Sequence, residues 1–307
     1  MTSTSEIPVL TPSSEGRVPA VTLGLPVHNG ERYLRLSLDS LLAQTFTDFE
    51  LIISDNASTD GTAEICREYA AHDRRIRYVR QPTNIGAGPN HNILPPMARA
   101  PYFKWASHDD VYDTELLRKC MEVFRMHPDA TLVHCWDARI DPEGNRLPER
   151  PYTLDTANPS PAARLRSLLH TDGGDDFYGV IRTDVLRRLG PHGSYFNADR
   201  VFVAGLSLYG PFHQVPEVLY FRREHPNRLS RASTRDRAAG LDPLRRSRLR
   251  HPEVRLYGEY VAGYYRTIRR APLSAADRWR CNVEVTRWVG TVTARIGRTR
   301  QLHVPVT

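Results

Sequence analysis

Two adjacent aspartates, Asp109 and Asp110, follow an apolar stretch that runs into "FKWASHDD". Neighbouring carboxylates repel each other, and burying them costs free energy unless a cation or hydrogen-bond donors meet them. Mg²⁺ and Mn²⁺ prefer such hard oxygen ligands and would in turn hold a diphosphate. The pair therefore predicts a divalent cation site, although two adjacent aspartates are also a common turn signal.

Other polar side chains that could bind a nucleotide follow the first two apolar runs of the chain. Asp55 ends the run "FELIISD", and its carboxylate can accept a hydrogen bond from the imide N–H of uracil or thymine. Asn29 follows "GLPVH" and stands before a helical pattern, where donors are available for polar ligand groups. The simpler role of Asn29 is to cap that helix.

The elements that must position these residues alternate along the chain. Apolar runs at 20–27, 49–55 and 76–81 predict buried strands, and amphipathic patterns at 31–45 and 61–73 predict helices. This alternation favours a parallel sheet with covering helices, and such sheets bind ligands at the carboxyl ends of their strands. The candidate residues would therefore meet at one edge of the sheet.

The alternation continues, less regularly, to residue 225. Pro95 and Pro96 predict a short or kinked helix, and the Pro, Gly and Asn of 141–160 predict a long loop. A glycine turn, a strand and a helix are expected within 173–190. Further strands are expected at 101–106, 130–141 and 213–224, and further helices at 113–128, 161–170 and 197–210.

Composition bounds the class of protein. The chain has 307 residues, 40% of them hydrophobic, which suffices for a large α/β domain, and a net charge of +7 from 42 basic and 35 acidic side chains. Its four cysteines lie far apart without a CxxC pair, which argues against a disulfide framework or structural zinc and favours a reducing cytoplasm. No apolar run approaches the roughly 20 residues that cross a bilayer. Residues 1–18 are expected to form a disordered tail.

The segment "VTLGLPVHNGERYLRLSLDSLLAQTFTDFELIISDNASTDGT", with the acidic motif after it, resembles the family 2 glycosyltransferases. The resemblance covers residues 18–225 and implies the GT-A fold, a Rossmann-like α/β fold whose mostly parallel sheet has flanking helices. It implies a catalytic domain at 19–225 after the tail at 1–18, followed by a basic, mainly helical region at 226–307.

The resemblance also assigns roles at the donor nucleotide. Pro26, Val27 and Asn29 would border the base, and Asp55 would bind its imide edge. His28 stands where the family commonly has an aromatic residue.

The motif "HDD" resembles the family's DxD motif, with His108 in the first acidic position. Asp110 would then be the metal ligand, and Asp109 would contact ribose or the metal. His225, just after the last predicted strand, would be a further ligand through its neutral imidazole, or else a surface histidine. Diphosphate contacts would come from the nearby arginines Arg222, Arg223 and Arg228.

The stretch "YFNADRVFVAGLSLYG" is similar to the segment that carries the family's catalytic base at a helix start. Asp199 matches the aspartate of the usual Glu-Asp pair, and Ala198 replaces the glutamate. Such a carboxylate can take the proton of an acceptor hydroxyl, although an aspartate there also stabilises the helix dipole. The acceptor side would lie in "DGGDDFYGV", where Asp175 and Asp176 are rival bases. Its glycines allow close backbone approach: Gly173, Gly174 and Gly179.

The predicted function is an inverting, metal-dependent glycosyltransferase that uses Mn²⁺ or Mg²⁺ and moves a sugar from a nucleotide diphosphate sugar to an acceptor hydroxyl. The imide-binding aspartate favours UDP, with TDP as the alternative. The acceptor would be a glycan, a lipid-linked molecule or a small molecule.

Two other classes compete with this function. A nucleotidyltransferase that forms nucleotide sugars would need a glycine-rich phosphate loop, which "GLPVHNGERY" does not resemble. A nucleic-acid-binding module is suggested by the basic charge alone, but the aromatic residues lie in apolar periodic segments, so no nucleic acid partner is expected.

The C-terminal region divides into two parts. Residues 226–252 are polar and arginine-rich without a period, whereas 254–297 carry two helical patterns separated at "APLS". We expect these helices to pack on the catalytic domain, to form a homodimer, or to contact an anionic membrane surface that holds a lipid-linked acceptor. The protein is expected in the cytoplasm, in the third case at the inner face of the membrane.

Overall fold

A mixed sheet forms the centre of the computed structural model, which describes residues 17–147, 154–170, 175–226, 228, 234–242, 247 and 251–301. Its strands are β1 (Val21–Val27), β2 (Phe49–Asp55), β3 (Ile76–Arg80), β4 (Tyr102–Trp105), β5 (Val111–Tyr112), β6 (Leu132–Ile140), β7 (Val180–Arg182) and β8 (Phe212–Arg223). The strand order is β3-β2-β1-β4-β7-β6-β8-β5. β1 to β4 pair in parallel, as do β6 and β8, whereas β7 and β5 run antiparallel to their neighbours.

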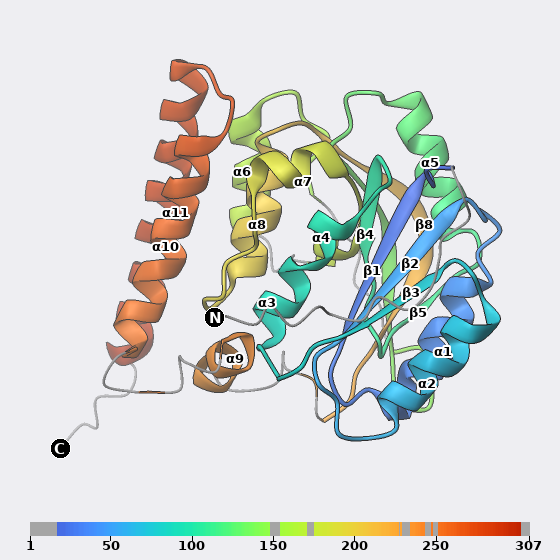
Figure 1. Ribbon diagram of the computed structural model, residues 1–307. Coiled ribbons are helices and arrows are strands. Elements are labelled where there is room, and N and C mark those ends of the chain that lie inside the picture. The colour runs from blue at the N-terminus through green and yellow to red at the C-terminus, as the bar shows by residue number, and fades with distance from the viewer. Residues whose placement is uncertain are drawn as a thin grey trace, which may run out of the picture.

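Helices cover both faces of this sheet (Figure 1). One face carries α1 (Glu31–Leu42), α2 (Thr62–His72) and α5 (Leu116–Met126). The other carries α3 (Ala87–Asn92), α4 (Leu94–Met97), α7 (Thr183–Leu189) and α8 (Ala198–Ser207), with α6 (Pro161–His170) against α8. The predicted α/β fold with a mostly parallel sheet is confirmed.

β1 is buried along its whole length, as expected for a strand inside a parallel sheet with helices on both faces. Leu23 and Leu25 belong to the apolar cluster that includes α1. At Gly24 a Cβ would lie 2.6 Å from the ring of Phe103 in β4 and 3.2 Å from Leu94 in α4, so the missing side chain leaves room for both residues. This packing sets the carboxyl end of β1 at a defined place beside β2 and β4.

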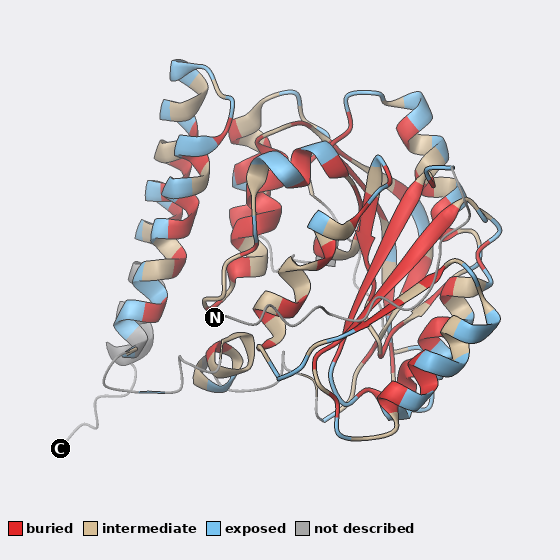
Figure 2. Cartoon of the chain, viewed as in Figure 1, coloured by how far each residue is buried: buried red, intermediate tan, exposed pale blue. Residues whose placement is uncertain are grey.

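The C-terminal helices α10 (Glu253–Arg270) and α11 (Ala275–Gln301) stand side by side at the left of Figure 1. Their buried stripes face α6 and α8 (Figure 2). Trp288 makes edge-to-face contacts with Tyr260 and Tyr264, at ring-centroid distances of 5.6 and 5.4 Å. Packing on the rest of the chain, one of the three expectations for these helices, is therefore observed. Among the described helices, none has a stretch long and apolar enough to cross a bilayer.

Three local features differ from the sequence prediction. The stretch 226–252 contains a helix, α9 (Thr234–Leu241), which was not predicted. Among the side chains of α9 that the structure describes, only Ala238 is fully buried, so the sequence shows no apolar periodicity there. The one short or kinked helix expected around Pro95 and Pro96 is two short helices, α3 and α4, of six and four residues, with both prolines in the first turn of α4. β5 has two residues and was not predicted. Most of the predicted tail, residues 1–16, lies outside the described residues.

Candidate active site

A cavity of about 1180 Å³ opens at the carboxyl ends of β1, β2 and β4. Its wall combines these strand ends with residues of α3, α8 and α9 and with the segment that follows β8. This is the edge at which parallel α/β sheets bind ligands. Eight predicted site residues line it: Pro26, Val27, Asn29, Asp109, Asp199, Arg222, His225 and Arg228.

Other predicted residues are placed differently. Among the residues that the structure describes, Asp55, Asp110 and Arg223 do not line the cavity. Gly173 and Gly174 lie outside the described residues. Asp175 and Asp176 begin the short 3₁₀ helix η1 (Asp175–Tyr178), and their side chains also lie outside what is described.

Asn29 joins the end of β1 to the turn between β2 and α2. Its backbone has φ of 53°, in the left-handed region that asparagine tolerates. Its N–H donates to Ser58 Oγ (3.0 Å), and its Oδ1 accepts from the Thr59 N–H (2.8 Å). α1 has Gly30 at its N-cap and no side-chain cap, so Asn29 links two strand ends and does not cap the helix.

Asp55 lies behind the cavity wall and is fully buried. Its Oδ1 accepts a hydrogen bond from the Ser58 N–H (2.8 Å), and its Oδ2 accepts one from the Tyr78 hydroxyl (2.8 Å). The Arg80 guanidinium is 3.6 Å away. Both carboxylate oxygens of Asp55 thus accept a hydrogen bond from within the protein, as a buried charge requires. Asp55 holds the turn after β2 and does not line the cavity, so its contact with the base stays a prediction.

Asn56, the next residue, lines the cavity instead. Its Oδ1 accepts from the Ile85 N–H (2.8 Å), and its Nδ2 donates to Asn84 Oδ1 (2.9 Å). Asn84 Nδ2 donates in turn to His28 Nε2 (3.1 Å). Our sequence prediction omitted Asn56 and Asn84, although both stand in turn-forming stretches just after predicted strands, where a ligand-binding residue is expected.

Asp109 and His225 form a pair on the cavity wall. His225 Nε2 lies 2.9 Å from Asp109 Oδ2, and the Ser107 hydroxyl donates to the other carboxylate oxygen. Burial acts to raise the pKa of Asp109, but the hydrogen bond from His225 and the charges of His108 and Arg228 outweigh it and hold that pKa well below its ordinary value. Asp109 is therefore a carboxylate anion at neutral pH.

Asp110 faces away from this pair. It is fully buried and accepts hydrogen bonds from the Tyr220 hydroxyl and from the Arg223 N–H (2.9 Å). Burial, and then the charge of Asp109, raise the pKa of Asp110. The Arg223 side chain is also buried and donates to the backbone oxygens of Asp109 (3.0 Å) and Pro142 (2.9 Å). Different hydrogen-bond donors hold the two carboxylates, and the Arg228 guanidinium also lies 3.5 Å from Asp110 Oδ1. We predicted Asp110 as a metal ligand and Arg223 as a diphosphate contact, but neither residue lines the cavity.

Asp199 lies in the first turn of α8, after an N-cap residue, Asn197, with φ of 55°. Its side chain is partly exposed and lines the cavity. Among the described residues, no donor is hydrogen-bonded to its carboxylate. Its ionisable neighbours include His91 and His192; burial lowers their pKa values, and the charge of Asp199 acts in the opposite direction. The carboxylate is therefore available to a ligand.

His192 was not predicted from "GPHGS", which has the composition of a turn, yet it lies beside Asp199 on the cavity wall. Asn92 clamps its backbone: the His192 N–H donates to Oδ1 (2.8 Å) and its carbonyl accepts from Nδ2 (2.7 Å). Burial lowers the pKa of His192 to about 4, against the opposing charge of Asp199, so the ring is neutral at neutral pH. The ring is 6% exposed, and its Nδ1 has no hydrogen-bond partner among the described residues. This nitrogen is covered by protein atoms, so a ligand in the cavity could satisfy it only after the ring turns toward the cavity.

The Asp109–His225 pair fits a Mg²⁺ or Mn²⁺ ion that is bound together with a diphosphate. An oxygen donor and a nitrogen donor lie side by side on the wall of one cavity. These ions usually keep water and phosphate oxygens as their remaining ligands, so a small set of protein ligands suffices. Arg222 and Arg228 line the same cavity, and each is also near a carboxylate, Arg222 at 3.7 Å from Asp137 and Arg228 at 3.5 Å from Asp110.

Comparison with protein families decides the class of this site. Residues 22–190, more than half of the chain, match the family model described as glycosyl transferase family 2. The chain belongs to this family. It therefore contains a family 2 glycosyltransferase domain, as the sequence motifs predicted.

Curated relatives of this glycosyltransferase align with part of its length. A chondroitin synthase of Escherichia coli is 33% identical over 131 residues, which are 43% of this chain and 19% of the relative. An uncharacterized glycosyltransferase of Rickettsia prowazekii is 31% identical over 157 residues, which are 50% of this chain and 48% of the relative. Another of Methanocaldococcus jannaschii is 32% identical over 133 residues, which are 43% of this chain and 46% of the relative. The chain spans less than half of the length of these relatives.

Solved structures share its fold. S. aureus TarS (residues 1–349) aligns with a TM-score of 0.67 at 18% identity, over 94% of this chain and 76% of that one. The mannosyltransferase PcManGT of Pyrobaculum calidifontis, in complex with GDP-Man and Mn²⁺, aligns with a TM-score of 0.54 at 16% identity, over 94% and 79%. The predicted GT-A fold of the family 2 glycosyltransferase is confirmed.

Proposed function

We propose that this glycosyltransferase transfers a sugar from UDP to an acceptor hydroxyl with inversion, using Mg²⁺ or Mn²⁺. One observation carries the proposal: a single cavity combines the anionic Asp109–His225 pair with the available carboxylate of Asp199 beside the neutral ring of His192. The first pair suits a cation and a diphosphate, and the second suits a hydroxyl that must lose its proton. Inverting, metal-dependent glycosyl transfer uses both.

The base of the donor would lie on the polar row of His28, Asn56 and Asn84. Each amide nitrogen has two N–H bonds, and the contacts described above use one of them, which leaves the other for a carbonyl oxygen of uracil. Asp55 acts from behind, because it holds the turn that presents Asn56. TDP offers the same polar edge. Solved complexes of TarS contain UDP or UDP-GlcNAc, and that of PcManGT contains GDP-Man, so a test must include guanine as well.

Asp109 and His225 would hold the cation, with Arg222 and Arg228 near the diphosphate. The bound ion would neutralise the charge that grows on the departing diphosphate. Asp110 would be a positioning residue, since its contacts with Tyr220 and Arg223 set the direction of its neighbour Asp109. This assignment moves the metal ligand from Asp110, which the motif suggested, to Asp109.

Asp199 would be the general base. As the acceptor oxygen forms its bond to the anomeric carbon, the bond from that carbon to the diphosphate oxygen breaks and its electron pair leaves with the nucleotide. The acceptor proton passes to Asp199, and attack from the face opposite to the leaving group inverts the anomeric centre. His192 and Asp199 both line the cavity, and the unpartnered Nδ1 of His192 would bind an acceptor hydroxyl beside Asp199 once the ring turns toward the cavity. Asp175 and Asp176 stay the rival bases.

The division into a catalytic part at 19–225 and a basic helical region at 226–307 is also part of the proposal. Arg228, Arg237 and Leu241 of the second region line the cavity, which supports a contribution of this region to ligand binding. The acceptor would be a glycan, a lipid-linked molecule or a small molecule. The homodimer, the peripheral membrane contact and the cytoplasmic location stay predictions.

Calorimetric titration with UDP, TDP and GDP, each with Mn²⁺ and with a chelator, tests the donor site. The expected result is binding of UDP that the chelator abolishes. Tighter binding of GDP than of UDP would contradict the choice of uracil as the nucleotide base. UDP binding that is equal with Mn²⁺ and with the chelator would contradict the metal dependence. UDP-sugars would then be tested for transfer with the product anomer determined by NMR.

A further inference from the structure

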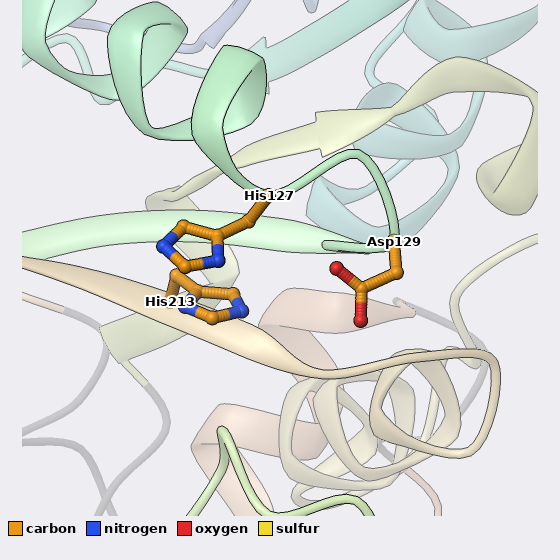
Figure 3. Close-up of side chains that lie close together, drawn as sticks. All are labelled: His127, Asp129 and His213. Atoms are coloured by element: carbon orange, nitrogen blue, oxygen red, sulfur yellow. The ribbon is translucent and has the colours of Figure 1, made fainter.

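A second group of side chains that could bind a metal ion lies near the starts of β6 and β8, whereas the cavity lies near the end of β8. Figure 3 shows its three members, His127, Asp129 and His213. His127 directly follows α5, Asp129 stands in the turn before β6, and His213 is the second residue of β8. The ligand atoms that the three side chains offer all lie within 4.8 Å of one another. β8 leads from this group to Arg223 beside the cavity, which separates the two places by roughly 30 Å at the usual rise per residue of a strand.

The two chain segments that carry these side chains are fixed to each other through their backbones. The Thr131 N–H donates to the Pro211 carbonyl (2.8 Å), and the Ala130 N–H donates to the His127 carbonyl (3.0 Å). Arg182 of β7 donates from Nε to the Ala130 carbonyl (2.7 Å). The Cα positions of the three side chains are therefore held before any ion binds.

Gly210 permits the close approach of these segments. A Cβ at this position would overlap Thr131 Oγ1 and would lie 2.9 Å from the Asp129 carbonyl oxygen. Because glycine has no Cβ, the start of β8 can pack directly on the turn that carries Asp129, and His213 comes within reach of the other two side chains.

The donor set indicates the class of ion. Two imidazole nitrogens and one carboxylate oxygen suit borderline ions such as Zn²⁺, Co²⁺ and Ni²⁺ better than Mg²⁺. The rings of His127 and His213 are stacked, with centroids 3.8 Å apart and planes at 17°. In stacked rings the nitrogen lone pairs point in parallel directions and do not converge on one ion. For His127 and His213 to bind the same ion, one ring would have to turn about its Cβ–Cγ bond. Both rings are partly exposed and Asp129 is exposed, so there is room for this movement.

We propose that His127, Asp129 and His213 form a second metal site that binds Zn²⁺ or a similar borderline divalent ion. Three protein ligands hold the ion and leave a coordination position for water or another ligand. The ion joins the end of α5 to the start of β8 and is independent of the cation at Asp109 and His225.

Zn²⁺ titration of the full chain in excess Mg²⁺ tests this site, with Co²⁺ as a second probe whose visible absorption reports protein ligands. The variants are His213→Gln and His127→Gln, and the matched control is His72→Gln, which changes an exposed histidine of α2. His225→Gln removes a side chain of the active-site pair. Circular dichroism without metal checks that each variant is folded.

We expect the wild type, His72→Gln and His225→Gln to bind one equivalent of Zn²⁺ that His213→Gln and His127→Gln lack, with loss of the Co²⁺ absorption in the same two variants. Asp129→Asn should also weaken binding, because the neutral amide oxygen is a poorer ligand than a carboxylate. Equal uptake by the wild type and His213→Gln, or no uptake by the wild type, would overturn the proposal.

Discussion

The Asp109–His225 side of the cavity and the Asp199–His192 side differ in how their polar atoms are satisfied. On the first side, both oxygens of Asp109 accept hydrogen bonds, and the buried Asp110 and Arg223 support them. On the second side, Asp199 accepts no hydrogen bond from the described residues, and His192 Nδ1 is buried without a partner. One side is complete before a ligand binds, and the other is not.

This difference matches two different chemical tasks. Groups that stabilise a developing charge work best when they are already oriented, because no reorganisation is then needed during the reaction. Groups that bind and deprotonate an incoming hydroxyl must keep their hydrogen-bonding capacity for it. A buried polar atom without a partner costs about 1–3 kcal/mol of stability, and a bound acceptor would return that free energy as affinity.

The largest expected effect is on the incomplete side. Asp199→Asn should lower the transfer rate by about 10²–10⁴ while nucleotide binding stays unchanged, because the amide cannot take the proton. Steady-state kinetics and calorimetry with UDP and Mn²⁺ measure the two quantities. The matched controls are Asp175→Asn and Asp176→Asn. If Asp199→Asn keeps its turnover and either control loses it, the base is the other carboxylate.

Asp109→Asn should remove the negative charge of the Asp109 carboxylate from the Asp109–His225 side of the cavity. We expect metal-dependent nucleotide binding to weaken by about 2 kcal/mol, roughly thirtyfold, because a buried charged partner of the cation is lost.

Asp110→Asn should lower the unfolding free energy and leave most of the metal dependence intact, since Asp110 contacts Tyr220 and Arg223. A selective loss of metal dependence in Asp110→Asn would return the ligand to the residue that the motif suggested.

The buried ring of His192 should make stability depend on pH. Its pKa is about 4 in the folded protein against 6.5 for an ordinary histidine, so the unfolded chain binds more protons between these values. Stability is then fully present above pH 6.5 and is lost as the pH falls toward 4. Between about pH 7 and pH 5 the wild type should lose about 2 kcal/mol more than His192→Asn in urea unfolding. Parallel curves for the two proteins would contradict the buried neutral ring.

The smallest expected effect is on acceptor affinity. His192→Asn should raise the acceptor KM about tenfold, since one hydrogen bond to the acceptor is lost, and should leave the Kd of UDP unchanged. The control is His91→Asn, whose ring already has its Nδ1 bonded to the Ala87 carbonyl (2.8 Å). An unchanged acceptor KM in His192→Asn would mean that His192 makes no hydrogen bond to the acceptor.

Much of this protein follows from local sequence patterns. The alternation of buried strands and amphipathic helices predicted the α/β sheet, and the order of the motifs "PVHN", "SDNASTDGT" and "SHDD" predicted the family and the edge of the sheet at which its site lies. These signals are readable because strand and helix periods and strand ends are properties of short segments.

Tertiary structure decided which side chain of each motif faces the cavity. Asp55 and Asn56 are neighbours, as are Asp109 and Asp110, and no local pattern distinguishes the members of either pair. Contacts with remote segments do: Tyr78 engages Asp55, and Tyr220 and Arg223, more than 100 residues along the chain, engage Asp110.

The same holds for the residues that no motif contains. His192 stands in a turn-like stretch, and its burial beside Asp199 depends on a clamp from Asn92, 100 residues away in the sequence. His127 and His213 meet because β6 and β8 pair in parallel and Gly210 lets their starting segments touch. The sequence alone determined the fold class, the family and the edge of the sheet that binds the ligand. Only the tertiary structure decided the orientation and pairing of the side chains there, because these depend on burial and hydrogen bonds between distant segments.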